Sequence, residues 1–394
     1  MTTRGTVSRL AAFGESVFTR ISRLAAEHRA VNLGQGFPNF DGPEFVKEAA
    51  CRAIADGHGQ YARMSGIPEL NRVIADRFNA EQGVLVDPDR EVTVTSGCTE
   101  AIAATMLGLV ETGDEVVLVE PFYDSYPAAV AMAGGTVRTV RMRSPEFHVP
   151  VDELRRAVGP RTRLILINSP HNPTGRVLTD AELEAIADIA MQAGCLVVSD
   201  EVYEHIWFER PHRSIASLPG MAERTIVLSS LGKTFSLTGW KIGWAIAPVH
   251  LTAGIRAAHQ FLTFATATPL QHAAVVALQA PSSYHEQLRE DYAARRQAML
   301  EALRGAGLDP LVPQGAYFVL CDHTRFGFPG DEAFCEHLIR QVGVAAIPCS
   351  AFHADASGAR HLVRFAFCKD LATIHAAGAR LKAGLRGLAA VPGS

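Results

Sequence analysis

Lys233 lies between two apolar runs, which makes it the residue of this sequence best placed for chemistry. Residues 225–228 precede it and residues 242–247 follow it, and both runs have the composition of buried strands. Burying an ammonium group without a partner is costly, so a partly desolvated lysine amine loses its proton more easily. Such an amine is a nucleophile and forms a Schiff base with an aldehyde.

Two plainer interpretations of Lys233 exist. Gly232-Lys233-Thr234 is also the end of a phosphate-binding P-loop, but that motif requires glycine at position 227, where the chain has Val227. The other interpretation is an ordinary surface lysine on a loop. This stretch alone leaves that interpretation open, so the rest of the chain has to decide.

The middle of the chain alternates short β-branched runs with helical stretches. The predicted strands are residues 92–95, 116–119, 136–140, 164–168, 196–199, 225–228 and 242–247. Predicted helices at residues 100–110, 126–133 and 179–192 separate most of them. This βα alternation predicts an α/β fold in which a mostly parallel seven-stranded sheet is covered on both faces.

The two ends of the chain have a different pattern. We predict an N-terminal arm with a helix at 9–28, then a strand followed by a Gly/Pro turn within 31–39, and then a helix at 43–57. After about residue 250 the chain is helical, with a charged helix at 283–304, and then gives strands at 316–320, 344–347 and 362–367 and a last helix at 371–388. The predicted domains are therefore an arm with part of a small domain (1–38), a large domain (39–285) and a small α+β domain (286–394).

Polar residues follow five of the predicted strands at the point where each strand ends. Ligands of open parallel sheets bind outside the carboxyl ends of the strands, so these residues are expected in one crevice. The segments that meet there are 96–99, 120–123, 168–175, 200–203 and 230–233.

The first part of this set suits a phosphate group. Gly97, Cys98 and Thr99 precede and open a predicted helix, whose N-terminus offers free amide groups and a positive dipole end. Ser230 and Lys241 add a hydroxyl and a cation. Taken singly, each of these features is also explained as a helix cap or a surface charge.

The second part of the set suits an aromatic aldehyde. A phosphate site and an aldehyde site in one crevice together fit pyridoxal 5'-phosphate (PLP). Tyr123 is expected to stack on the ring, and Asp200 to hold a proton on the pyridine nitrogen through a charge-assisted hydrogen bond. Asn172 and Tyr203 are expected to donate to the ring 3-oxygen. Each residue alone has a structural explanation, as a core residue, a strand end or a turn. Their conjunction at strand ends favours the cofactor.

The chain resembles the fold-type-I PLP-dependent aminotransferases of class I/II. The motifs that carry the resemblance are Ser-Pro-His-Asn-Pro-Thr-Gly (169–175), Ser-Asp-Glu-Val-Tyr (199–203), Ser-x-x-Lys-Thr-Phe (230–235), Thr-Gly-Trp-Lys-Ile-Gly (238–243) and Val-Arg-Phe (363–365). Segments 32–38, 60–61, 120–126 and 363–369 are similar to two groups within that family. One is the kynurenine/glutamine/methionine aminotransferases, and the other is the actinobacterial-type N-succinyldiaminopimelate aminotransferases.

The resemblance implies roles for further residues. Lys233 holds the cofactor as a Schiff base and shuttles the proton, while Asp200 and Tyr203 assist catalysis. Arg364 binds the substrate α-carboxylate, with Asn172 and the backbone of Gly36 beside it. Tyr61 reaches the phosphate of the neighbouring subunit, which implies a homodimer with composite active sites.

The substrate side-chain pocket is expected to be mostly apolar. Phe18, Tyr123 and Thr99 are expected to form it, with Phe264 from the partner subunit. No arginine must face a distal carboxylate, although Arg20 or Arg63 are candidates, so a neutral, largely apolar amino donor is predicted. Thr99, Ala265 and Asn39 depart from the kynurenine-type pattern, which keeps N-succinyldiaminopimelate as the alternative donor.

Composition excludes several other classes. A net charge of −4 over 394 residues gives no sign of nucleic-acid binding, and no apolar run is long enough to span a bilayer. Seven scattered cysteines and the absence of a signal-peptide pattern or metal-ligand spacing predict a cytoplasmic, metal-free protein. A PLP β/γ-lyase and a carbon–carbon bond-forming enzyme remain alternatives on the same scaffold. A non-enzymatic regulator with an aminotransferase-like domain is disfavoured, because it would need a basic DNA-binding segment before residue 31, where the given sequence has only thirty residues.

Overall fold

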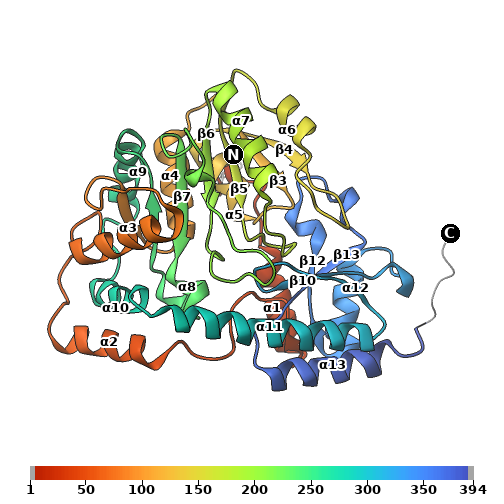
Figure 1. The fold of residues 1–394 in the computed structure, drawn as a ribbon. Coiled ribbons are helices and arrows are strands. Elements are labelled where there is room, and N and C mark those ends of the chain that lie inside the picture. The colour runs from red at the N-terminus through yellow and green to blue at the C-terminus, as the bar shows by residue number, and fades with distance from the viewer. Residues whose placement is uncertain (1–4, 389–394) are drawn as a thin grey trace.

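The centre of the computed structural model, which describes residues 5–388, is a seven-stranded sheet (Figure 1). Its order is β2-β8-β7-β6-β5-β3-β4. The strands are Val92–Thr95 (β2), Glu115–Glu120 (β3), Thr136–Arg141 (β4), Thr162–Asn168 (β5), Leu196–Asp200 (β6), Thr225–Ser230 (β7) and Gly243–Ile246 (β8). Strand β8 runs antiparallel to both its neighbours, and the remaining pairs are parallel. The predicted, mostly parallel α/β sheet is confirmed.

Helices cover both faces of this sheet, which explains why its strands are continuously apolar. In β5, Leu164 and Leu166 pack on one face, and Ile165 and Ile167 pack on the other. Helices α4 (Cys98–Leu109), α5 (Ser125–Ala133) and α9 (Val249–Leu262) lie on the first face, and α6 (Val151–Ala157) and α7 (Asp180–Ala193) lie on the second.

A third group of helices packs beside β2 and β8. It comprises α2 (Glu44–Ala55), α3 (Pro68–Gln82) and α10 (Thr268–Leu278). Helix α3 is not among the predicted elements, although it carries two ordinary signals. Pro68 occupies its first turn, and Gly83 ends it in the left-handed conformation with φ of 70°.

The second layer is a four-stranded sheet with helices around it. Its order is β12-β13-β10-β9, with Asp309–Leu311 (β9), Phe318–Asp322 (β10), Ile347–Pro348 (β12) and Leu362–Ala366 (β13). The helices are α11 (Ser282–Gly305), α12 (Asp331–His337) and α13 (Leu371–Leu385). The predicted single strand at 344–347 is wrong. Val344–Ala345 (β11) pairs with Val31–Asn32 (β1), whereas Ile347 pairs with Arg364 on β13, because the chain passes between two sheets at Ala346.

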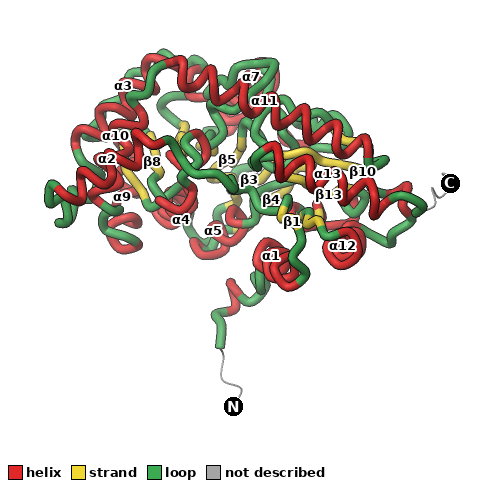
Figure 2. Tube along the Cα trace, turned by 90° about the horizontal axis from the view of Figure 1, so that it is seen from below, coloured by secondary structure: helices red, strands yellow, loops and turns green. Residues whose placement is uncertain are grey.

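The predicted helix at 9–28 is correct only in its second half. Helix α1 spans Val17–Glu27, because the Ser16 side chain caps it by accepting a hydrogen bond from the Thr19 amide at 3.2 Å. Before it lies a single 3₁₀ turn, Ser8–Leu10 (η1), in a segment that leads away from α1 (Figure 2).

The remaining short helical segments connect these layers. They are Leu231–Thr234 (α8), Ile215–Ser217 (η2), Thr238–Trp240 (η3), Thr324–Phe326 (η4), Leu338–Val342 (η5, a π turn), Cys349–Phe352 (η6) and Ala356–Gly358 (η7). Helix α11 continues through the predicted domain boundary at residue 285. The domain boundaries at 38 and 285 stay predictions. Residues 1–4 and 389–394, which belong to the outer two predicted domains, lie outside the described part of the chain. Among the described helices, none is both long and apolar enough to cross a membrane.

Candidate active site

A cavity of about 390 Å³ opens at the edge where β2, β3, β5, β6 and β7 end. Strand β8 begins at that edge because it runs against its neighbours, and it brings Lys241 there. Thirteen of the residues predicted for the site line this one cavity: Phe18, Gly36, Gly97, Cys98, Thr99, Tyr123, Asn172, Asp200, Tyr203, Ser230, Lys233, Lys241 and Arg364. Residues up to 346 positions apart in the chain, Phe18 and Arg364 (364 − 18), therefore meet in one place.

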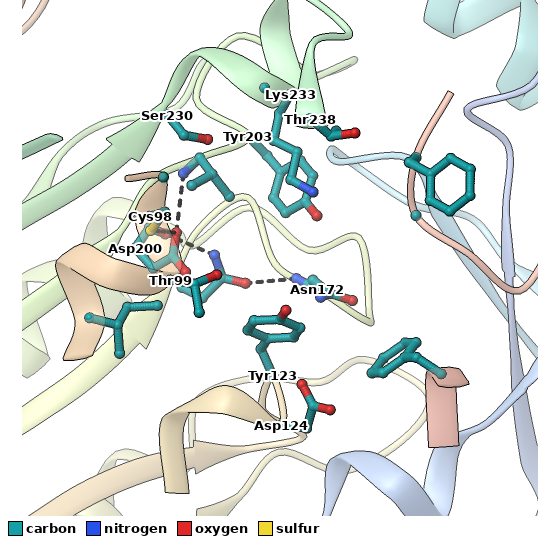
Figure 3. Close-up of a pocket in the computed structure, with 18 of the residues that line it drawn as sticks. Cys98, Thr99, Tyr123, Asp124, Asn172, Asp200, Tyr203, Ser230, Lys233 and Thr238 are labelled. Atoms are coloured by element: carbon teal, nitrogen blue, oxygen red, sulfur yellow. Dashed lines mark hydrogen bonds between the residues drawn. The ribbon is translucent and has the colours of Figure 1, made fainter. Parts of the chain in front are cut away.

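Lys233 reaches into this cavity from the short helix α8, directly after Ser230 at the end of β7 (Figure 3). Its Nζ atom lies 5.5 Å from the centre of the Tyr203 ring and 5.9 Å from that of Tyr317. Burial among these rings lowers the pKa of the Lys233 amine, although nearby acidic groups such as Asp200 oppose the shift. The surroundings thus favour the neutral, nucleophilic form of the amine.

Asp200 ends β6 as a buried carboxyl with three donors. Its Oδ2 accepts a hydrogen bond of 2.7 Å from the Tyr126 hydroxyl, and its Oδ1 accepts from the Val202 amide at 3.3 Å and the Cys98 thiol at 3.7 Å. Burial raises the pKa of Asp200, and the Tyr126 hydrogen bond is the first influence that opposes this. Within residues 5–388, no cationic side chain forms a salt bridge with Asp200, although the charge of Lys233 also favours its ionised form.

Helix α4 begins at the cavity wall with the geometry of an anion site. Gly97 precedes it with φ of 77°, and a side chain there would lie 3.2 Å from the Lys241 Nζ atom. A side chain at Gly243 would lie 2.5 Å from the Gly97 carbonyl carbon, so β8 packs directly against this turn. The first amides of a helix have no partner within it, and here they are beside Lys241 and Ser230.

Arg364 on β13 is 1% exposed and closes the opposite side of the cavity. Its Nη1 donates to Asn172 Oδ1 and its Nη2 donates to the Gly34 carbonyl, both at 2.7 Å. The guanidinium lies 4.2 Å from the centre of the Phe318 ring and 4.9 Å from that of Phe352. A guanidinium has five N–H groups, so about three remain for a ligand, and Nε has no partner among the described residues.

Aromatic side chains form the wall between Arg364 and the anion site. The rings of Phe18 and Tyr123 are 6.5 Å apart, and burial raises the pKa of Tyr123 to about 12. Gly36 is held close because its carbonyl accepts a hydrogen bond of 2.7 Å from Tyr317. Thr99 and Ile102 complete this wall from helix α4.

Several residues of the site were not predicted from the sequence, and four of them have polar side chains next to Asp200, Lys233 or Arg364. Tyr126 binds Asp200, and Asn168 donates to the Asp200 carbonyl and accepts from the Asn172 amide, both at 2.8 Å. Asp124 lines the cavity, and Tyr317 faces Lys233. A polar residue that ends an apolar strand was the available signal for Asn168, and spacing of three residues from Tyr123 was the signal for Tyr126.

Some candidate residues lie outside the cavity. Tyr61 is 85% exposed and Phe264 is 44% exposed, and their rings pack edge to face at 5.4 Å. Arg20 pairs with Glu332 at 3.0 Å, and Arg63 pairs with Asp89 at 2.7 Å. Among the described residues, no group of three or more His, Cys, Asp or Glu side chains is arranged to hold a metal ion.

Comparisons with known proteins agree with this geometry. The family model "Aminotransferase class I and II" matches residues 28–381. The chain is 48% identical to a probable N-succinyldiaminopimelate aminotransferase of Mycobacterium tuberculosis, covering 95% of this chain and 98% of that protein. It is 40% identical to the methionine aminotransferase of Escherichia coli, covering 95% and 97%.

The solved structure of N-succinyldiaminopimelate aminotransferase from Mycobacterium tuberculosis superposes with a TM-score of 0.94 at 48% identity. The match covers 96% of this chain and 99% of that one. Fold and sequence therefore lead to the same assignment. This chain belongs to the class I and II aminotransferases of fold type I, enzymes that depend on pyridoxal 5'-phosphate.

Proposed function

We propose that this aminotransferase takes the amino group from an α-amino acid with a neutral, largely apolar side chain. One observation carries the proposal. Among the described residues, the cavity holds one guanidinium, that of Arg364, and its substrate side is mostly apolar, with Phe18, Tyr123, Thr99 and Ile102 beside the one acidic side chain, Asp124. An apolar side chain gains about 25 cal/mol for each Å² that such a wall buries, whereas an unpaired carboxylate there would be strongly disfavoured.

The cavity suits PLP on three points of this structure. Burial lowers the pKa of the Lys233 amine and so favours its neutral form, which is the form that attacks an aldehyde. Asp200 is a buried carboxyl that forms no salt bridge within the described residues, which suits a protonated ring nitrogen. The first amides of α4 with Ser230 and Lys241 would hold the phosphate, and Tyr123, Asn172 and Tyr203 would contact the ring.

When bound, PLP supplies an electron sink that stabilises negative charge at the substrate Cα. The chain's own residues prepare that step. Arg364 and Asn172 would orient the α-carboxylate of the substrate. The Lys233 amine would act as the base that takes up the Cα proton and later gives a proton back. Tyr203, whose pKa burial raises well above its usual value, stays a neutral hydroxyl donor beside Lys233.

The net reaction exchanges an amino group for an oxo group between two acids. The donor loses two electrons and becomes a 2-oxo acid, and the acceptor gains two electrons and becomes an amino acid. No external oxidant or reductant is needed. Both acids must use Arg364 for the α-carboxylate, so donor and acceptor occupy the same cavity in turn.

We further propose that the working enzyme is a homodimer with composite sites. Tyr61 and Phe264 form an exposed aromatic pair outside the cavity of their own chain. Large exposed aromatic side chains that pack on each other favour burial against a partner. In this arrangement Tyr61 would serve the phosphate and Phe264 the substrate pocket of the neighbouring subunit.

N-succinyldiaminopimelate is the second candidate donor, and the 48% identity to the Mycobacterium tuberculosis protein favours it. This donor carries additional carboxylates. Arg20 and Arg63, the arginines considered for them, are paired with Glu332 and Asp89 outside the cavity. A cation for the second candidate would therefore have to leave one of these pairs or come from the partner subunit.

The test is a single-turnover comparison of donors, which needs no choice of acceptor. Purified holoenzyme is mixed with methionine, glutamine, kynurenine, aspartate or N-succinyldiaminopimelate, and the absorbance change of the cofactor gives kcat/KM for each half-reaction. We expect methionine and glutamine to exceed aspartate. If N-succinyldiaminopimelate exceeds the neutral donors by about a hundredfold, or 2.7 kcal/mol in transition-state binding, the second candidate replaces the first.

A further inference from the structure

Lys369 is a buried basic residue that the proposed chemistry leaves unused. It lies just after β13 and is 3% exposed, and burial lowers the pKa of its ammonium. In the part of the chain that the structure describes, the ammonium forms no salt bridge and a single hydrogen bond, which it donates to the Phe37 carbonyl at 2.6 Å. A buried ammonium with one neutral acceptor costs stability, so packing alone does not account for this residue.

The hydrogen bond and the cation–π contact of this ammonium are both with Phe37. The Lys369 Nζ atom lies 4.7 Å from the centre of the Phe37 ring, within the range of a cation–π interaction. An ammonium that binds the carbonyl and the ring of one residue restrains both its backbone and its side chain. Phe37 is 48% exposed and lines the cavity, so the restrained ring belongs to the wall that a ligand meets.

The segment that carries Phe37 is fixed to the small sheet over several residues. Four consecutive carbonyls, those of residues 34 to 37, accept hydrogen bonds from side chains of the C-terminal part of the chain. In that order the donors are Arg364 at 2.7 Å, Cys368 at 3.9 Å, Tyr317 at 2.7 Å and Lys369 at 2.6 Å. The bond from Lys369 is the shortest of the four, and it is the one that reaches the residue with a large side chain in the cavity.

This arrangement determines what a substrate side chain meets. Phe37 is three residues after Gly34, whose carbonyl shares the Arg364 guanidinium, so the two residues are at most about 11 Å apart along the chain. The ring therefore lies close to the point where Arg364 would bind an α-carboxylate. A long apolar side chain that extends from this point can bury surface against the ring, whereas the methyl group of alanine is too short to do so.

We infer that Lys369 is a positioning residue that holds the Phe37 ring in the cavity wall, where the ring selects donors with long apolar side chains. This inference rests on the proposed function, because it assigns a specificity determinant to the same cavity. Lys369 acts through Phe37 and does not itself touch the substrate. Loss of the ammonium should therefore weaken the binding of long apolar donors and leave alanine unaffected.

The ratio of kcat/KM for methionine to that for alanine, measured in single turnover with the holoenzyme, tests this inference. Lys369→Met keeps the length of the side chain and removes its charge, and it should lower the ratio at least about fivefold. Phe37→Ala should lower the ratio at least about tenfold. The loss should be in KM and not in kcat, since the ring contacts the side chain in the ground state and the transition state alike. Lys382→Met, which removes an exposed lysine of α13, should leave the ratio unchanged.

Two further measurements distinguish positioning from a general structural role. The double variant should have the same ratio as Phe37→Ala, within about twofold, because no ring remains for Lys369 to hold. Lys369→Met should also keep or raise the melting temperature, since it replaces a buried charge by an apolar side chain of similar size. If Lys369→Met fails to fold, Lys369→Gln removes the charge with a polar side chain, and the same ratio decides.

The outcomes separate this inference from the proposed function. If no amino acid discharges the cofactor, the proposed function fails, and calorimetric binding of 4-methylthiobutanoate and propanoate to the holoenzyme still compares a long with a short side chain. If N-succinyldiaminopimelate is the better donor, the ratio of methionine to alanine still tests Lys369. The inference is overturned if the Lys369 variant keeps the wild-type ratio, if the double variant is less selective than Phe37→Ala, or if the variant melts lower and loses kcat equally for both donors.

Discussion

The hydrogen bond from Tyr126 to Asp200 allows a quantitative prediction, because it is the shortest that this carboxyl receives from the described residues. Its length is 2.7 Å, whereas the Val202 amide is at 3.3 Å and the Cys98 thiol is at 3.7 Å. Tyr126→Phe removes the hydroxyl and keeps the ring. Since burial already raises the pKa of Asp200, the loss of this donor should raise it further.

The magnitude follows from the strength of the bond. A hydrogen bond to a charged group contributes about 1.5–3 kcal/mol to the ionised form, so its loss should raise the Asp200 pKa further. A more basic carboxyl draws the proton away from the cofactor ring nitrogen and weakens the electron sink. We therefore expect kcat in single turnover with methionine to fall by about 10- to 150-fold.

Tyr284→Phe is the matched control for this substitution. The Tyr284 hydroxyl is also part-buried, but it donates to the Thr234 carbonyl at 3.1 Å and not to Asp200. Stopped-flow absorbance on both holoenzymes, after cofactor content has been verified, measures the comparison. Equal values of kcat for the two variants, within about threefold, would refute the assignment of Tyr126 as the residue that maintains the charge of Asp200.

Four further predictions concern single features of the site and core. Lys233→Ala should bind PLP but yield no covalent cofactor after borohydride reduction, as mass spectrometry will show; a labelled peptide elsewhere would exclude Lys233. Mixing inactive Lys233→Ala and Tyr61→Ala chains should restore activity once subunits exchange, and no recovery would argue for a site within one chain. Arg364→Lys should lower kcat/KM about 10- to 150-fold, since an ammonium cannot replace the fork that reaches Asn172, Gly34 and a carboxylate together; an unchanged value contradicts that role. Burial lowers the pKa of His171 to about 3 from an ordinary 6.5. The stability that depends on neutral His171 is therefore complete above pH 6.5 and falls by roughly 1.4 kcal/mol for each pH unit as the pH drops toward 3. His171→Asn should flatten the pH dependence of the unfolding free energy between pH 6.5 and 5, as denaturant titrations will show.

The sequence allowed the large sheet to be predicted closely because its strands are buried on both faces. Residues 164–167, for example, are all apolar and are followed by the polar Asn168, so the sequence marks both the strand and the edge of the sheet where it ends. The direction of β8 could not be predicted in this way, since an antiparallel strand in the interior has the same composition as a parallel one. That direction is what brings Lys241 to Gly97.

The small domain was harder to predict because its strands are short and their partners are distant in sequence. The run 344–347 looks like one strand, yet pairing with Val31 on one side and Arg364 on the other divides it. For the candidate site, residue types that act through their own chemistry could be predicted, and the structure places two of them, Lys233 and Asp200, in one cavity. Residues that act by contact, such as Tyr126, were missed, because a buried tyrosine in a helix usually indicates core packing alone.

Helix α11 has a consequence for how the molecule unfolds. It runs without interruption over 24 residues, so it is about 36 Å long (Figure 1). Near the start of α11, the ring of Tyr284 stacks on that of Phe235 at 5.0 Å, and Phe235 lies two residues after Lys233. Further along, α11 packs against α13 beside the four-stranded sheet. A helix that contacts both layers couples them, because unfolding of either layer exposes part of its buried face. Heating should therefore give one calorimetric transition for the two sheets, with the loss of Arg364 and Lys233 from the cavity occurring together.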